Sequence, residues 1–150
     1  MTITKPAFEL TLSRIIDAPR ERVFKAWSEP KQVSRWFAPL PYTLPKCEMD
    51  FRPGGRFAMT MRSPEGVEHP FTGVYREVVP DSRLVWTGEF PYGPAEQMRT
   101  TITFEEQGKK TKLTANQVFW TLTPETEPHT KGAKQGWTAT LDQLEAFCAK

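Results

Sequence analysis

Few side chains in this sequence have the chemistry that a catalytic or metal site requires. The two histidines are His69, beside Pro70, and His129, in a proline-rich stretch. We interpret both as solvated loop residues, with contact of His129 to a cavity mouth as the alternative. The two cysteines, Cys47 and Cys148, lack metal-ligand or redox spacing and are interpreted as reduced, unreactive thiols, although a disulfide between them stays open. No HExxH motif, Cys/His cluster or glycine-rich phosphate loop occurs, so we expect no metal and no other cofactor.

Arg14 is the charged residue whose position is most informative. It shares its alternation with Leu12 and Ile16, so a regular strand would direct its guanidinium inward. A buried guanidinium needs a carboxylate or a ligand anion beside it. We interpret Arg14 as lying at a local bulge or as reaching past the sheet edge to water, and we keep an anion anchor as the alternative.

A larger group of apolar side chains could form the wall of a binding cavity. Methionine in such a wall adapts to varied apolar shapes, and tyrosine and tryptophan add the few polar contacts that orient an apolar ligand. Two glycines inside expected strands, Gly73 and Gly88, indicate a bend or a close backbone approach. The candidate ligand-binding residues are Trp36, Phe57, Met59, Met61, Phe71, Tyr75, Trp86, Met98, Trp137 and Leu141.

The same residues also fit an ordinary core. Aromatic and methionine side chains at strand alternation are more often plain core than ligand wall, so the alternation alone favours a filled interior. Gly136, directly before Trp137, also has two explanations, one from packing and one from ligand binding. Glycine inside a helix costs about 1 kcal/mol relative to alanine, and either a tight helix–sheet approach or a gap for ligand would explain it.

The elements that must position these residues follow from periodicity and turn chemistry. We predict a strand over Phe8–Asp17, a helix with Pro19 at its first position, and a second short helix from about Pro30. Residues 38–46 contain three prolines and are predicted to form a loop. The strands that follow are joined by short turns and must therefore pair antiparallel. Their expected ranges are Cys47–Arg52, Arg56–Arg62, Phe71–Val79, Arg83–Phe90, Gln97–Glu105 and Thr111–Trp120.

A long helix is predicted at the C-terminal end of the sequence. Residues 121–131 are polar, contain two prolines and are predicted to be a loop. Beyond them, apolar residues recur at three- and four-residue steps: Ala133, Trp137, Leu141, Leu144 and Cys148. The whole order is that of an α+β fold, a curved antiparallel sheet of about six to seven strands around one long helix.

The composition narrows the range of partners. A chain of 150 residues suits one core, so we expect a single domain over residues 1–150, with residues 1–7 as a flexible tail. The net charge is +2 and basic residues are scattered among acidic ones, so nucleic acid is not expected. No stretch approaches the ~20 apolar residues that span a bilayer, and residues 1–7 lack the apolar run of a signal peptide. We expect a cytoplasmic protein without membrane insertion, and a homodimer through a sheet edge stays open.

Several short motifs occur in a characteristic order. They are Arg14–Pro19 with Val23 and Trp27, Glu29-Pro30 with Trp36-Phe37, Asp50–Phe57, Gly73–Tyr75 with Pro80 and Arg83–Val85, and Gly136-Trp137 followed by Leu141 and Leu144. Their order and spacing, from about Phe8 to Cys148, resemble the SRPBCC or START-like superfamily. More narrowly, they are similar to the activator of heat-shock-protein-90 ATPase homologue-like family.

The resemblance implies a helix-grip fold, in which the C-terminal helix lies across the sheet and an apolar cavity opens between them. It therefore favours a ligand wall over a filled core for the candidate residues. Members of the wider superfamily bind lipids, sterols, polyketides or plant hormones, and some act as cyclases or aromatases. The eukaryotic chaperone activators carry an additional N-terminal domain that does much of the chaperone binding. This chain has no room for that domain, so chaperone activation is not the expected role.

Three functions remain to be separated. The leading hypothesis is a non-catalytic module that holds a small apolar or aromatic molecule between the sheet and the last helix. The second is an enzyme of the cyclase, aromatase or hydrolase kind, which requires at least two of Tyr75, Arg14 and His69 to converge in one pocket. The third is a chaperone-interacting protein that uses the exposed sheet face. No catalytic residue is assigned.

Overall fold

A curved antiparallel sheet with helices on one side organises the chain. The computed structural model describes residues 7–89, 98–120, 130 and 132–149. The sheet has seven strands in the order β1-β7-β6-β5-β4-β3-β2. The elements are β1 (Phe8–Ile16), α1 (Arg20–Ser28), α2 (Pro30–Trp36), β2 (Thr43–Met49), β3 (Arg56–Arg62), β4 (Glu68–Val79), β5 (Arg83–Glu89), β6 (Met98–Gln107), β7 (Lys110–Phe119) and α4 (Ala133–Cys148).

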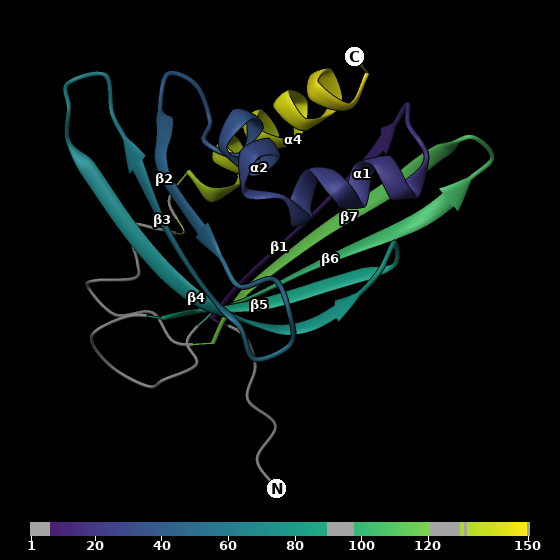
Figure 1. The fold of residues 1–150 in the computed structure, drawn as a ribbon, viewed down its shortest axis with the longest axis horizontal. Helices are drawn as coiled ribbons and strands as arrows, with labels where there is room; N and C mark the ends of the chain where they lie inside the picture. Colours follow the sequence, from purple (N-terminus) through teal and green to yellow (C-terminus); the bar gives the residue numbers. More distant parts are fainter. Residues whose placement is uncertain (1–6, 90–97, 121–129, 131, 150) are drawn as a thin grey trace, which may run out of the picture.

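The arrangement confirms the predicted fold class. The two short helices follow β1, and the meander from β2 to β7 then folds back until β7 pairs with β1. Their register runs without a break from Phe8 opposite Phe119 to Ile16 opposite Thr111. Figure 1 shows α1, α2 and α4 gathered on the concave side of the sheet, which places the core between the helices and the strands. Among the described residues, no helix combines the length and the apolar character needed to cross a membrane.

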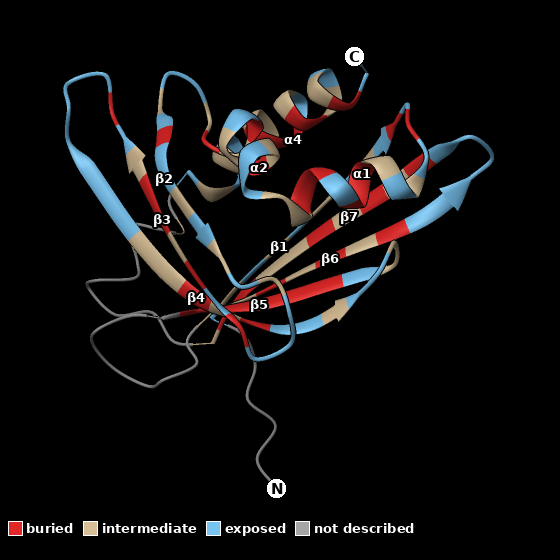
Figure 2. Cartoon of the chain, in the orientation of Figure 1, coloured by how far each residue is buried: buried red, intermediate tan, exposed pale blue. Residues whose placement is uncertain are grey.

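Burial follows the two periodicities that the sequence shows. Figure 2 shows buried positions along the middle of the strands and on the helix surfaces that face the sheet, whereas the hairpin ends are exposed. On α4 the buried residues are Thr140, Leu141, Leu144 and Cys148, the three- and four-residue steps of one helix face. The largest fully buried side chains include Ile16, Trp36, Leu84, Ile102, Leu113, Leu141 and Leu144.

The amide of Gln143 joins α4 to the chain that follows α2. Its Nε2 donates to the carbonyl oxygens of Trp36, at 2.9 Å, and of Ala38, at 2.8 Å. Its Oε1 accepts from the backbone N–H of Leu40 at 2.8 Å. One side chain thus satisfies three backbone groups at and just after the C-terminal end of α2. The last carbonyl groups of a helix have no partner within the helix.

Prolines account for the main errors in the predicted boundaries. Pro19 is the residue before α1, in extended conformation, and is not its first helical residue. The predicted loop over residues 38–46 is too long, because β2 already begins at Thr43. Pro45 lies where the register of β2 shifts against β3, and β2 is an edge strand, so its missing N–H is tolerated.

The start of β4 is also earlier than predicted. The strand begins at Glu68, which places His69 opposite Met61 in a regular pair. His69 is therefore an exposed strand residue and not part of a loop. Other predictions fall outside the described residues: those for His129, for Phe90, for the connection after it, and for most of the loop at 121–131.

Candidate functional site

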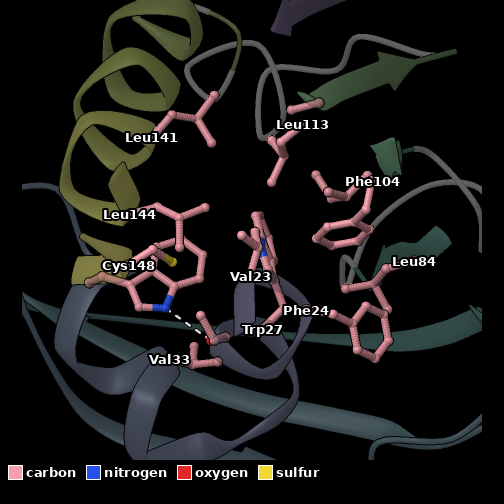
Figure 3. Close-up of a cluster of buried hydrophobic side chains, with 14 of the residues drawn as sticks. Val23, Phe24, Trp27, Val33, Leu84, Phe104, Leu113, Leu141, Leu144 and Cys148 are labelled. Atoms are coloured by element: carbon pink, nitrogen blue, oxygen red, sulfur yellow. Dashed lines mark hydrogen bonds between the residues drawn. The ribbon is translucent and has the colours of Figure 1, made fainter. Parts of the chain in front are cut away.

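Aromatic side chains from three strands and two helical segments meet on the concave face. Phe57 of β3 lies 5.3 Å from the ring of Tyr75 on β4 and 6.4 Å from that of Trp86 on β5, measured between ring centroids. Trp27 of α1 lies 6.0 Å from Trp86. Figure 3 shows Trp27 among the side chains of the sheet and of α4, so α1 contributes the central ring of the cluster.

A small hollow remains inside this cluster. Its volume is about 30 Å³, which is the volume of about one water molecule and far below the several hundred Å³ of a drug-sized ligand site. The interior is therefore filled by side chains in this structure. The lining residues are Trp27, Val33, Phe37, Phe57, Met59, Phe71, Tyr75, Leu84 and Trp86.

Trp27 carries an unusual polar group for such a place. The residue is 4% exposed, and its indole Nε1 is buried without a hydrogen-bond partner among the residues that the structure describes. Buried polar groups in folded proteins almost always find a partner, since an unmade hydrogen bond is costly in the interior. The Trp36 indole beside it follows the usual pattern and donates to the carbonyl of Ala26 at 2.9 Å.

Tyr75 brings a second polar group to the hollow. The turn after β2 holds its backbone, because Gly54 N–H donates to the Tyr75 carbonyl at 2.7 Å and Tyr75 N–H donates to the Gly55 carbonyl at 2.8 Å. A register shift between Tyr75 and Glu77 then bends β4. Burial, with the nearby Cys47 thiol as a smaller cause, raises the pKa of the Tyr75 hydroxyl well above its usual value. The hydroxyl is thus a neutral hydrogen-bonding group at physiological pH.

Two of the lining residues, Phe37 and Phe71, are only partly buried. Their rings stack with centroids 6.4 Å apart, and Phe37 also meets the edge of Trp137 on α4 at 6.5 Å. We call Phe37, Phe71 and Trp137 the rim of the hollow. Because the other lining residues are buried, the rim is where solvent comes nearest to the hollow.

Gln117 is a polar residue next to the rim that was not among the candidate site residues. Trp137 Nε1 donates to Gln117 Oε1 at 3.2 Å, and Gln117 Nε2 donates to Thr100 Oγ1 at 3.2 Å. Thr100 is fully buried. Gln117 shares the alternation of Leu113 and Ala115, which was the signal that a polar side chain would point inward there.

The structure divides the ten candidate residues into two groups, all within or against one apolar core cluster. The first group lines the hollow and consists of Phe57, Met59, Phe71, Tyr75 and Trp86. The second group does not line it: Trp36 and Leu141 are fully buried, whereas Met61, Met98 and Trp137 are partly buried. Trp27, Val33 and Phe37, which come from the two short helices, line the hollow although they were not candidates.

Gly136 does not mark a tight approach of α4 to the sheet. A Cβ atom built on it would meet no atom within 4 Å. Of the two explanations left open by the sequence, the tight helix–sheet approach is therefore ruled out, and among the described residues Gly136 borders open space.

Arg14 has carboxylate partners and no bulge. The pairing of β1 with β7 continues through Arg14, opposite Leu113. Its guanidinium lies 3.3 Å from Asp142 and 3.5 Å from Glu145 on α4, and its side chain is 23% exposed. The interpretation of a bulge is thus wrong, whereas the side chain does reach the surface, where exposed carboxylates of the protein supply the anion that Arg14 requires.

The three polar residues named for the enzyme hypothesis do not converge. Arg14 pairs with α4, His69 lies exposed with its ring 6.2 Å from that of Tyr42, and Tyr75 lines the hollow. Across the described ranges, no cluster of three or more His, Cys, Asp or Glu side chains could hold a metal ion.

Both cysteines are free thiols, so the alternative of a disulfide is wrong. Burial raises the pKa of each from 9.0 to about 11, and the positive charge of Arg22 partly offsets this for Cys148. Neither thiol is activated toward nucleophilic attack.

These features define the class of the protein. A long C-terminal helix lies across the concave face of a curved antiparallel sheet, with an aromatic interior between them. This is a helix-grip domain of the START-like class. The family model described as "Activator of Hsp90 ATPase homolog 1-like protein" matches residues 17–149. The chain belongs to this family, within the SRPBCC superfamily.

Solved structures of bacterial proteins agree with this assignment. Protein NE0264 of Nitrosomonas europaea is 31% identical over 93% of this chain and 92% of its own, with a TM-score of 0.79. Protein CV1439 of Chromobacterium violaceum is 30% identical over 92% of this chain and 95% of its own, with a TM-score of 0.78. An AHSA1-like protein of Aeromonas hydrophila, 21% identical over 93% and 91% of the two chains, shares the fold with a TM-score of 0.76. No curated protein matches the sequence.

Proposed function

We propose that this domain binds a small apolar or aromatic molecule in the hollow between the sheet and its helices. The observation that carries the proposal is the rim: the hollow is lined by aromatic and aliphatic side chains, and only Phe37 and Phe71 of that lining are partly buried. An apolar site with few polar groups is the usual form of a small-molecule site.

Binding requires the hollow to grow. Rotation of Phe37 and Phe71 toward solvent would add their volume to it, and Met59 can adapt because its side chain is unbranched. Trp137 bounds the rim from α4, and a Cβ atom built on the adjacent Gly136 would meet no described atom within 4 Å. The ligand would thus replace side-chain contacts that the ligand-free protein makes with itself.

Native mass spectrometry of the freshly purified protein tests the proposal, with gentle and denaturing conditions compared. An extra mass that leaves on denaturation would support it and show the class of ligand. Protein of bare mass is then titrated with N-phenyl-1-naphthylamine, an uncharged fluorescent probe. We expect fluorescence enhancement, and we expect Phe71→Ala to change the affinity because it widens the rim.

The matched control is Val79→Ala. Val79 lies on the same strand as Phe71, is 45% exposed and is remote from the hollow lining. Its replacement should leave probe binding unchanged. A bare mass together with no probe binding, or an equal response of the two variants, would contradict the proposal.

A further inference from the structure

The polar groups of the hollow indicate which molecules it accepts. On the basis of the proposed function, we infer that the ligand is an uncharged aromatic molecule that carries a hydrogen-bond acceptor, such as a ketone or aldehyde oxygen or a ring nitrogen. The acceptor binds the indole N–H of Trp27.

The Trp27 N–H differs from the indole N–H groups of Trp36 and Trp137. Trp36 donates to Ala26 and Trp137 donates to Gln117, so both have acceptors within the protein. Trp27 has none, although its Nε1 is buried and its side chain lines the hollow. An indole nitrogen can only donate, so the missing partner must be an acceptor.

Tyr75 supports the same chemistry. Its hydroxyl has no hydrogen-bond partner among the described residues, and burial keeps it protonated. It can donate to the same acceptor or to a second one on the ligand. The hollow therefore offers donors, and within the described lining no charged or carbonyl-bearing side chain competes for them.

The lining also limits the charge of the ligand. All its described members are apolar or aromatic. An ionised carboxylate or ammonium group would leave water without a counter-charge, which is very unfavourable. Arg14, the inward-facing cation of β1, is already paired with Asp142 and Glu145. We therefore exclude carboxylates and amines from the class of ligand.

Three probes that share one ring system test the inference: naphthalene, 2-acetylnaphthalene and 2-naphthoate. We expect 2-acetylnaphthalene to bind about threefold to tenfold more tightly than naphthalene, as one hydrogen bond implies, and 2-naphthoate to bind most weakly. Trp27→Phe removes the N–H and keeps an aromatic ring. It should abolish the preference for the acetyl compound over naphthalene, whatever its effect on the affinity for naphthalene itself.

A direct readout avoids dependence on the variant, which could fold poorly because Trp27 is a core residue. The chain has five tryptophans, and each indole N–H group gives one signal in a ¹⁵N–¹H spectrum, which is recorded on the wild-type protein. We expect 2-acetylnaphthalene, and not naphthalene, to shift the Trp27 indole proton downfield. The resonances of Trp36 and Trp137 should move less, since their acceptors stay in place.

The possible failures can be told apart. If none of the three probes binds, the proposed function itself fails. If naphthalene binds as tightly as the acetyl compound and the Trp27 resonance does not shift, a ligand site exists but the inference is overturned. Preferred binding of 2-naphthoate, or a water molecule that stays hydrogen-bonded to Trp27 in the presence of the acetyl compound, would also overturn it.

Discussion

The ring of Phe57 lies where a side chain on Gly73 would begin. The two residues are paired on neighbouring strands, β3 and β4. A Cβ atom built on Gly73 would collide with Cζ and Cε2 of Phe57, and it would also lie 2.6 Å from the carbonyl oxygen of Thr87. The absence of a side chain at position 73 thus allows the Phe57 ring to pack directly on the backbone of β4 and form one wall of the hollow.

Gly73→Ala should destabilise the protein. The Phe57 ring can shift toward the hollow, but the backbone oxygen of Thr87 cannot move without distorting β5. We expect a loss of about 2 kcal/mol in the free energy of unfolding, the range of an overpacked core, measured by urea denaturation. A loss near zero would mean that the strands separate easily here.

Gly136→Ala should have the opposite effect. Gly136 lies inside α4, and a new Cβ atom would meet nothing within 4 Å. Alanine restricts the unfolded chain and favours the helix, so we expect stabilisation of roughly 0.5–1 kcal/mol in the same measurement. Destabilisation would show that residues outside the described ranges occupy the space beside α4.

Gln143→Ala should loosen α4. The substitution leaves the carbonyls of Trp36 and Ala38 and the N–H of Leu40 without the partner they have now. We expect a loss of about 1–3 kcal/mol in the free energy of unfolding. The control is Gln135→Ala on the exposed side of the same helix, for which a change within about 0.5 kcal/mol is expected. Equal effects of the two substitutions would contradict the contribution of these bonds.

The buried thiols should make stability fall in alkaline solution. Burial raises the pKa of Cys47 and Cys148 from 9.0 to about 11, so the folded state retains these protons where the unfolded state loses them. The stabilisation is complete below pH 9 and is lost as the pH rises through 11. Urea denaturation at successive pH values should show this fall, and Cys47→Ala/Cys148→Ala should reduce it.

Thiol labelling gives an independent check. At pH 8 the thiolate fraction of a group with a pKa of about 11 is about 100-fold lower than that of an ordinary thiol. A disulfide reagent should therefore react slowly with the native protein and rapidly after unfolding. Fast labelling of the native protein would contradict the raised pKa values of the two thiols.

Strand alternation was sufficient to predict many of the side chains that lie on the inner face of the sheet. The direction of a side chain on a strand is a local property, so Phe57, Met59 and Tyr75 could be assigned to one face from spacing alone. The same rule also indicated Gln117, but polar residues were not included among the candidates.

What alternation could not show depends on contacts between distant elements. The partner of Arg14 is Asp142, 128 positions away, and no pattern within β1 identifies the helix that passes over it. The size of the hollow depends in the same way on how closely α1 and α2 approach the sheet, which determines how far Trp27 and Phe37 fill the interior. Proline was misjudged for a different reason: the edge position of β2, which tolerates Pro45, is a property of the complete sheet.

The pairing of β1 with β7 also affects the order of folding. β1 is an edge strand, and its one neighbour ends at Phe119. On the ribosome the first strand must therefore wait until about a hundred further residues have been made before it can form its ladder. Contacts so far apart in sequence slow folding, and the apolar side of β1 stays uncovered during that time. The nascent chain should consequently be most dependent on chaperones before β7 is complete.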